Sequence, residues 1–360
     1  MSVRNDIGKL HLPEVLDGVT SAADWEVRRQ EIVALLAQEE YGPIPDFPCE
    51  ITYEVGPNER YGGGSADYYQ VTITVTTPRG SHAFPLSCVI PRAGRPCPAF
   101  VHVNFRGGVP DSYMPSEEIS DNGFACFSFC YNDVTMDNAD FTDGLAGLVY
   151  PDGVRGPHDP GKISLWAWAA MRAMDYIATL PAIDQKNIGI IGHSRLGKTA
   201  IWTAANDLRY SFVFANQSGC CGAALTRGAP EDAEHIDQIC KTFPYWLCEN
   251  YKKYVGHIEE LPFDQHWLLA TIAPRRLYVS SAEEDRWTGP DSQYRACVET
   301  AKVWEALGCV PGFTGPDAYP GGNDAFQEGY IAYHSRTGDH FLSRRDWLQF
   351  MKYFKKYRNQ

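Results

Sequence analysis

The sequence predicts an α/β fold in which helices flank a mostly parallel central sheet, as a three-layer sandwich. Two observations support this prediction. Strand-like apolar runs alternate with helix-like segments over most of the chain, and the most apolar run leads directly into a helix. No linker, repeat or low-complexity segment interrupts the pattern, so residues 1–360 are expected to form a single domain.

Residues 1–95 are expected to form an N-terminal helix followed by antiparallel lead-in strands. Ser21 is a typical helix N-cap, and helical apolar spacing runs over Trp25–Glu40 until Tyr41-Gly42-Pro43 ends it. Strand-like runs follow at Cys49–Val55, Tyr68–Thr76 and Ala83–Ile90. The second run alternates most clearly between apolar and polar residues, as a half-buried strand does.

The predicted central sheet begins with two buried strands, Pro98–Asn104 and Phe124–Cys130. Asp137–Asp159 is rich in Gly, Asp and Pro and is expected to be a loop. Ile163–Leu180 has the spacing of a helix. Asn187–Gly192 is rich in isoleucine, which favours a strand buried on both faces in a parallel sheet.

The same alternation continues to the end of the chain. The expected strands are Ser211–Asn216, Arg276–Ser280 and Tyr330–His334, and the expected helices are Asp264–Ile272, Asp291–Leu307 and Trp347–Tyr357. Residues 218–260 are expected to form a polar insertion near the active site.

Composition and charge narrow the possible functions. A net charge of −13 argues against a nucleic-acid partner, because phosphates require a basic surface. No apolar run approaches a membrane span, and the first residues contain no apolar signal segment. The eleven cysteines lack a disulfide-like framework. We therefore expect a cytoplasmic protein without a membrane partner, although a secreted protein with its signal trimmed would look the same. The oligomeric state stays open.

The strand that ends at Gly192 turns sharply at Ser194 into the alanine-rich helix Thr199–Asn206. Such a corner lifts a serine Oγ clear of the backbone and lets the next amide stabilise an oxyanion. An α/β-hydrolase needs this arrangement for its nucleophile, so Ser194 is the candidate nucleophile. Its simpler alternative is a plain helix N-cap.

The same stretch also matches a second template. Gly192-x-x-x-x-Gly197-Lys198-Thr199 satisfies the Walker A pattern of P-loop NTPases. A P-loop normally opens its domain, however, whereas several strands precede this motif. The NTPase hypothesis also leaves Ser194 and His340 without a role. A serine hydrolase is therefore preferred, with the NTPase and an inactive carbohydrate-binding protein as alternatives.

The triad of an α/β-hydrolase occurs in the order serine, acid, histidine. Glu283-Glu284-Asp285 follow the strand that ends at Ser280, and His340 lies in a loop after the last strand. Loops at the carboxyl ends of parallel strands form the site in such sheets. His340 would accept the proton of Ser194, and the acid would orient the imidazole. Asp285 fits the usual spacing best, with Glu283 and Glu284 as alternatives.

The loop Asn104–Gly108 follows an earlier strand and is expected to supply the second oxyanion donor. Arg106, inside this loop, either pairs with a surface acid or reaches an anionic substrate. The histidines at 102, 193 and 266 are expected to be core or supporting groups, and His334 is expected to be structural. The spacing of the histidines indicates no metal site.

Gly192-His-Ser-Arg-Leu-Gly-Lys198 resembles the Gly-Cys-Ser-Arg-x-Gly-Lys signature of glucuronoyl esterases, carbohydrate esterase family 15. The similarity extends over most of the chain. It includes Gln217–Gly222, Trp246–Tyr254, Leu261–His266, Ile272–Arg275, Arg336–His340 and Asp346-Trp347. The resemblance implies a serine esterase that cleaves esters of 4-O-methyl-glucuronate and needs no metal or other cofactor.

The resemblance also implies roles for three site residues. Arg195 would help form the oxyanion hole, Lys198 would contact sugar hydroxyls, and Trp287 would pack near the uronate. An arginine beside the developing oxyanion adds a charge-assisted donor.

Two positions depart from the family pattern. His193 replaces a Cys, and Gln217 stands where many members carry the Glu of the triad. Because a neutral amide cannot stabilise an imidazolium as a carboxylate does, Asp285 is inferred to be the acid. Gln217 remains a substrate-binding candidate. Related sequences are often labelled acetyl xylan esterases, so a sugar O-deacetylase is the alternative within the class.

Overall fold

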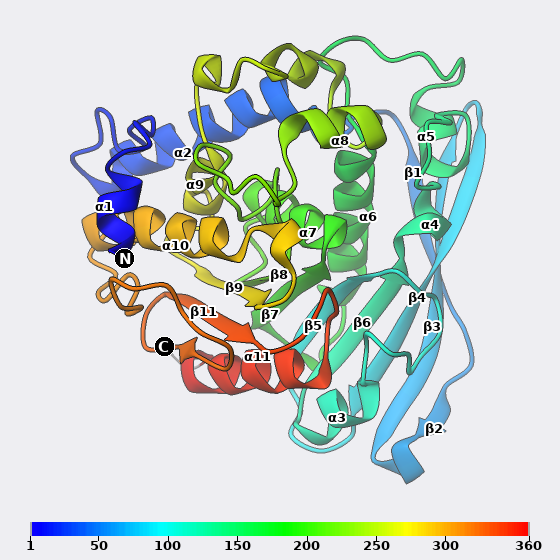
Figure 1. The fold of residues 1–360 in the computed structure, drawn as a ribbon. Coiled ribbons are helices and arrows are strands. Elements are labelled where there is room, and N and C mark those ends of the chain that lie inside the picture. The colour runs from blue at the N-terminus through cyan, green and yellow to red at the C-terminus, as the bar shows by residue number, and fades with distance from the viewer. Residues whose placement is uncertain (1, 359–360) are drawn as a thin grey trace.

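One eleven-stranded mixed sheet runs through residues 2–358, the part of the chain that this computed structural model describes (Figure 1). The strands are β1 (Glu50–Val55), β2 (Glu59–Tyr61), β3 (Ala66–Thr77), β4 (Gly80–Pro91), β5 (Cys97–Asn104), β6 (Ala125–Cys130), β7 (Ile183–His193), β8 (Phe212–Asn216), β9 (Arg276–Ala282), β10 (Ala325–Phe326) and β11 (Ile331–Arg336). Their order in space is β1-β3-β4-β6-β5-β7-β8-β9-β11-β10, with β2 paired to β3.

Parallel pairing occupies the centre of the sheet. Strands β6, β5, β7, β8, β9 and β11 pair in parallel, whereas β1 to β4 and β10 join antiparallel. The α/β prediction is therefore confirmed: the central strands are parallel, and the antiparallel strands at the two edges make the whole sheet mixed. Every residue of β5, β6, β8, β9 and β11 is buried, because helices cover both faces of the centre.

The helices form a layer on each face of the sheet. They are α1 (Val3–Ile7), α2 (Ala22–Leu36), α3 (Ser116–Asp121), α4 (Tyr131–Val134), α5 (Gly144–Val149), α6 (Lys162–Ile177), α7 (Arg195–Asn206), α8 (Ile236–Thr242), α9 (Gln265–Ala270), α10 (Pro290–Ala306) and α11 (Arg344–Tyr357). Figure 1 shows α11 and α3 on one face, and α6, α7, α9 and α10 on the other. Short helical turns are η1 (Ala37–Tyr41), η2 (Gly62–Gly64), η3 (Glu249–Tyr254), η4 (Ile258–Glu260) and η5 (Arg286–Thr288).

The two layers enclose two hydrophobic cores. The core beneath α11 is aromatic, and the ring of Phe100 from β5 lies 5.2 Å from the rings of both Trp347 and Phe354. Val101 and Val103 point to the opposite face and join the larger core. Alternate residues of one strand thus serve both cores, as the period of a β-strand requires.

The register of the central strands determines where the chemistry lies. His193 at the end of β7 is level with Asn216 at the end of β8, which is level with Ser280 of β9. Because these strands are parallel, the residues that follow them emerge at one edge of the sheet. The segments after β7, β8, β9 and β11 therefore meet there.

Two segments differ from their predicted character. The expected loop Asp137–Asp159 contains the short helix α5, which its Gly, Asp and Pro content concealed. The expected polar insertion, residues 218–260, contains α8, η3 and η4, and its residues 218–227 are buried. Part of this insertion is therefore packed in the protein interior rather than exposed to solvent.

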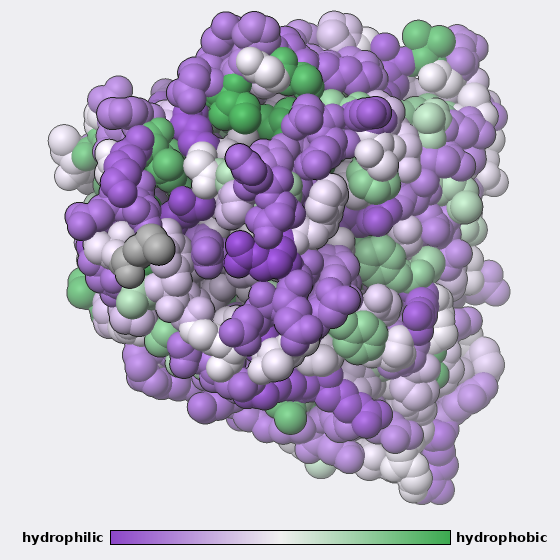
Figure 2. All heavy atoms as spheres, in the orientation of Figure 1, coloured by the Kyte–Doolittle hydropathy of each residue, from purple (hydrophilic) through white to green (hydrophobic). Residues whose placement is uncertain are grey.

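The surface of the face in Figure 2 is mostly hydrophilic, with hydrophobic residues in small groups. None of the helices in residues 2–358 is long and apolar enough to cross a membrane.

Candidate active site

Ser194 lies on a sharp turn between β7 and α7. Its backbone is in a region that only strained turns occupy, with φ 56° and ψ −129°, and its N–H donates to the carbonyl of Asn216 at 2.9 Å. A Cβ on Gly192 would collide with the backbone carbonyl of Leu196, so only glycine fits there. The helix begins at Arg195, four residues earlier than predicted. This is the geometry of a nucleophile elbow.

The structure brings Asp285 and His340 together. The two residues follow β9 and β11, and Nδ1 of His340 lies 2.7 Å from Oδ2 of Asp285. The same carboxylate oxygen accepts a hydrogen bond from the hydroxyl of Thr288 at 2.7 Å. The Asp285 side chain is 2% exposed, whereas Glu283 and Glu284 are exposed. Of the three predicted acids, only Asp285 reaches the histidine.

The pKa of Asp285 is lowered. Burial alone would raise it, but the hydrogen bond from His340, the charge of that histidine and the Thr288 hydroxyl outweigh burial. Asp285 is therefore a carboxylate at neutral pH, as a group that stabilises an imidazolium must be.

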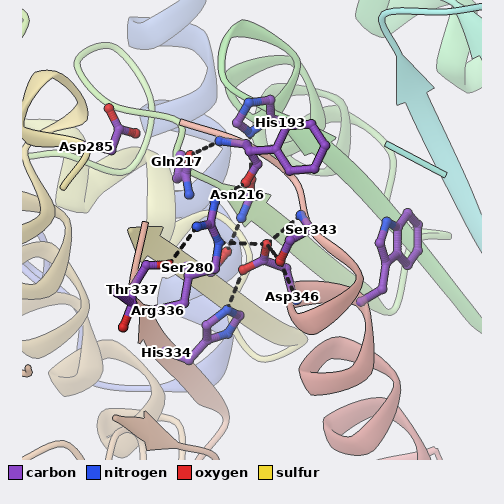
Figure 3. Close-up of polar contacts among 12 residues, drawn as sticks. His193, Asn216, Gln217, Ser280, Asp285, His334, Arg336, Thr337, Ser343 and Asp346 are labelled. Carbon is purple, nitrogen blue, oxygen red and sulfur yellow. Dashed lines mark hydrogen bonds and ion pairs between the residues drawn. The ribbon is translucent and has the colours of Figure 1, made fainter. Parts of the chain in front are cut away.

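His193 packs directly on the candidate catalytic histidine. Its ring centre lies 4.4 Å from that of His340. Its Nδ1 lies 2.6 Å from Oδ1 of Asn216, as Figure 3 shows. Burial, and then the nearby His340, lower the pKa of His193 to about 3. This imidazole therefore stays neutral and forms one wall of the His340 site.

Gln217 braces the loop that carries His340. The residue follows β8, is fully buried and has a positive φ of 48°. Its Oε1 accepts a hydrogen bond from the N–H of Phe341 at 2.9 Å, and its Nε2 has no partner within residues 2–358 (Figure 3). The amide thus contacts the backbone next to His340.

Arg195 is held between a carboxylate and aromatic rings. Its Nη1 forms an ion pair with Asp137, which also accepts a hydrogen bond from the indole of Trp246 at 2.7 Å. The guanidinium carbon lies 4.6 Å from the ring centre of Trp246 and 5.2 Å from that of Phe243. The first turn of α7 therefore presents a fixed cation beside Ser194.

Lys198, one turn further along α7, is 3% exposed. Its ammonium donates to the carbonyl of Ser218 at 2.7 Å and to the carboxylate of Glu234 at 3.0 Å. This cation, predicted to contact sugar hydroxyls, already has two protein partners. Thr199 donates its hydroxyl to the carbonyl of Arg195 at 3.0 Å. These contacts engage the two side chains that a Walker A motif would direct at phosphate and Mg²⁺.

Arg106 and Trp287 flank the site at the surface. Arg106 hydrogen-bonds the hydroxyl of Ser112 and lies 5.1 Å from the ring centre of Tyr113. Its partner is thus a hydroxyl rather than the surface acid considered above. Trp287, two residues after Asp285, is 47% exposed. An exposed aromatic side chain of this kind is suited to stacking on a ligand.

A second polar network, between β11 and the start of α11, supports the loop that carries His340 (Figure 3). Asp346 is fully buried and accepts hydrogen bonds from His334 at 2.8 Å, Arg336 at 3.1 Å and the Ser343 hydroxyl at 2.6 Å. Arg336 in turn donates to the carbonyl of Phe341 at 2.5 Å. His334 is thus a structural group, as predicted.

Sequence reasoning missed Asp137 and Glu234, the two carboxylates that pair with the cations of the site. Asp137 lies in the segment expected to be a loop, and Glu234 lies in the insertion. Each is one of many acids in an acidic chain, and only the fold shows which of them meets a cation. No feature of the sequence marked Tyr113 either, although its ring stacks on that of His193 with the ring centres 5.4 Å apart.

Matches to known proteins extend over most of the chain. A family model described as glucuronyl esterase of fungi matches residues 73–308. Carbohydrate esterase MZ0003, from an unknown prokaryotic organism, is 30% identical, and the match covers 96% of this chain and 89% of that protein. The 4-O-methyl-glucuronoyl methylesterase of Podospora anserina is 29% identical over 82% of this chain, which spans 59% of that relative.

Solved structures agree with the sequence comparisons. The glucuronoyl esterase from Solibacter usitatus superposes with a TM-score of 0.86 at 33% identity, covering 96% of this chain and 97% of that one. An esterase of carbohydrate esterase family 15 from a marine bacterial metagenome superposes with a TM-score of 0.83 at 29% identity, covering 94% and 93%. The likeness therefore includes the N-terminal strands as well as the central sheet.

Proposed function

Because this chain belongs to the glucuronoyl esterase family, carbohydrate esterase family 15, and is a carboxylic ester hydrolase, we propose that it cleaves glucuronoyl esters through an acyl-enzyme on Ser194. The observation that carries this proposal is the 2.7 Å hydrogen bond between His340 and the buried Asp285, beside the strained turn at Ser194. A serine, an ionised acid and a histidine, in this chain order, are the parts of a serine esterase of the α/β-hydrolase type.

The proposed reaction begins with His340 accepting the proton of Ser194 as Oγ attacks the ester carbonyl. Asp285 stabilises the resulting imidazolium and holds the ring in place. Arg195 and backbone N–H groups at the turn and in the Asn104–Gly108 loop stabilise the oxyanion. His340 then protonates the departing alcohol, and a water molecule releases the acid from Ser194 by the same steps.

The uronate specificity is supported by the family and by the residues around the triad. Several relatives are named 4-O-methyl-glucuronoyl methylesterases, and this chain keeps the Arg195 and Lys198 of the signature. The exposed ring of Trp287 supplies an apolar face for a sugar next to Asp285. The amide of Gln217 takes the place of a carboxylate without loss of an acid, because Asp285 contacts His340.

The test is hydrolysis of two substrates by the purified protein and by Ser194→Ala. Benzyl glucuronate offers a uronate ester, and an acetylated xylo-oligosaccharide offers an acetyl ester on a similar sugar. The proposal expects acid release from the glucuronate, lost in Ser194→Ala, with little acetate released. Acetate release alone would keep the triad and overturn the uronate specificity. Hydrolysis that persists in Ser194→Ala would overturn the mechanism.

A further inference from the structure

Both cations next to the nucleophile are paired with a carboxylate from the protein. Arg195 pairs with Asp137, and Lys198 pairs with Glu234 at 3.0 Å. The Asp137 and Glu234 side chains are 10% and 6% exposed, so their charges are only weakly screened by solvent. The two positive charges are therefore balanced inside the site.

Asp137 is fixed by contacts other than the ion pair. Its Oδ1 accepts from Trp246 at 2.7 Å, and its Oδ2 accepts from the hydroxyl of Tyr131 at 3.1 Å. Its backbone N–H donates to Asn132 at 2.9 Å, and its carbonyl accepts from Tyr245 at 3.0 Å. Contacts from several segments thus hold the carboxylate against Arg195.

Arg195 is fixed in the same way. Asp137 engages Nη1, and three aromatic rings surround the guanidinium, with Trp246 the nearest at 4.6 Å. Its Nε is buried and has no hydrogen-bond partner within residues 2–358. Asp137 therefore determines both where this guanidinium points and how much net charge it presents beside Ser194.

The charge matters because substrate and product differ in charge. A glucuronate ester is neutral at its carboxyl group, whereas the released acid carries a full negative charge. An unbalanced arginine at this position would bind that carboxylate strongly through charge-assisted hydrogen bonds. A carboxylate fixed behind the arginine opposes this binding, while the neutral ester is hardly affected.

We propose that Asp137 is a positioning and specificity-determining residue. Acting through Arg195, it lets the site accept the neutral ester and release the uronate anion. The inference rests on the proposed function, because it takes the product to be a uronate. The negative charge of Asp137 also weakens the electrostatic stabilisation of the oxyanion by Arg195. Backbone N–H groups supply the rest of that stabilisation.

The test measures binding of methyl glucuronate and of glucuronate by calorimetry in a Ser194→Ala background, which does not turn over. Asp137→Asn keeps an acceptor for Trp246 but removes the charge. We expect the affinity for the acid, relative to the ester, to rise about tenfold. Asp121→Asn makes the same charge change on the exposed end of α3 and is expected to leave the ratio unchanged.

An unchanged ratio in Asp137→Asn, or an equal shift in Asp121→Asn, would overturn the inference. Failure of Ser194→Ala to bind either ligand would overturn the proposed function instead.

Should Asp137→Asn not fold, inhibition of the wild-type enzyme by glucuronate supplies a second measurement. Because the site is balanced, the inhibition constant of glucuronate should change less than about twofold between low and moderate salt. A steep weakening with salt would show an unbalanced cation and contradict the inference.

Discussion

Asp285 differs from its neighbours Glu283 and Glu284 in burial and in partner. Only Asp285 is buried, and only it contacts His340. The two glutamates instead use their backbone N–H groups, which donate to Arg336 at 2.8 Å and Gly338 at 3.1 Å. One short stretch thus provides both the acid and the backbone contacts that hold it next to the histidine loop.

We expect Asp285→Asn to lower kcat by about 10⁴-fold, because the amide no longer stabilises the imidazolium of His340. Glu284→Gln removes a charge one residue away and should stay near wild type. Steady-state hydrolysis of benzyl glucuronate measures both. An inactive Glu284→Gln together with an active Asp285→Asn would show that Glu284, and not Asp285, is the triad acid.

Chain order and strand ends indicated Ser194, His340 and the acidic stretch 283–285, since each follows a predicted strand. Asp285 was preferred within that stretch, but Glu283 and Glu284 stayed open, because burial and contact with His340 depend on the fold. The partners of Arg195 and Lys198 could not be selected in this way. Asp137 and Glu234 lie in irregular segments whose path depends on tertiary packing, and no local pattern marks an acid that will face a cation. The bracing role of Gln217 was hidden for the same reason, because its partner is a backbone N–H of residue 341.

At the scale of elements, the turn between β7 and α7 depends on one glycine. A side chain on Gly192 would meet the backbone of Leu196, whereas a Cβ on Gly108 would meet nothing within 4 Å. The strand and the helix can approach closely only where the Cβ is absent.

Gly192→Ala is therefore expected to lower the free energy of unfolding by more than about 3 kcal/mol and to abolish hydrolysis. Gly108→Ala, the matched control, should change stability by no more than about 0.5 kcal/mol. Urea unfolding measures both variants. Equal stabilities would show that the elbow tolerates a side chain and that the strained turn is not required.

The π-helical turn η1 buries an acid with an unusual pKa. Glu40 is fully buried and accepts hydrogen bonds from Gln265 at 3.1 and 3.3 Å. Burial raises its pKa to about 8 from an ordinary 4.5, outweighing contacts with Cys221 and Gln265 that favour the charged form. The negative charge of Asp264 adds to the rise, and the positive charge of Lys198 opposes it.

This shift makes stability depend on pH. Between pH 4.5 and about 8 the folded chain keeps a proton that the unfolded chain has released, so Glu40 lowers stability progressively as pH rises. Glu40→Gln has no such proton. Its stability relative to wild type should therefore grow by several kcal/mol between pH 5 and pH 9, as measured by urea unfolding. A difference that stays constant over this range would contradict a protonated Glu40.

Most elements were predictable because their signals are local. The central strands are continuous apolar runs, and the α7 helix follows directly on one of them. The short helix α5 was missed because Gly144 and Gly147 are poor helix formers, and its packing against α6 and β4 outweighs their propensity. Burial of residues 218–227 was missed because the segment contains polar residues such as Thr226 and Arg227. In the fold their backbone N–H groups donate to the buried carboxylate of Asp264, and the Arg227 guanidinium pairs with the same carboxylate.

On the largest scale, the loop that carries His340 is held by both the sheet and the helix α11. Gln217 contacts it from the sheet edge, and Arg336 and Asp346 contact it from β11 and α11. Asp346 also accepts from Ser343 at the start of α11, so one buried carboxylate caps a helix and anchors the loop.

Asp346→Ala is expected to lower the free energy of unfolding by about 3 to 5 kcal/mol, because it leaves Arg336 buried without its carboxylate. Glu328→Gln breaks an exposed pair with Lys356 and should cost less than about 1 kcal/mol. Thermal and urea unfolding of the two variants provide the comparison. Similar small losses would show that the Asp346 network does not anchor the loop.

The most direct test of the mechanism is covalent labelling of Ser194. A fluorophosphonate reacts with a serine that a histidine activates, and peptide mass mapping locates the label. We expect stoichiometric labelling at Ser194 in the wild type, and labelling slowed by orders of magnitude in His340→Ala and Asp285→Asn. A label on another residue, or labelling of Ser194 that neither substitution slows, would contradict a Ser194–His340–Asp285 triad.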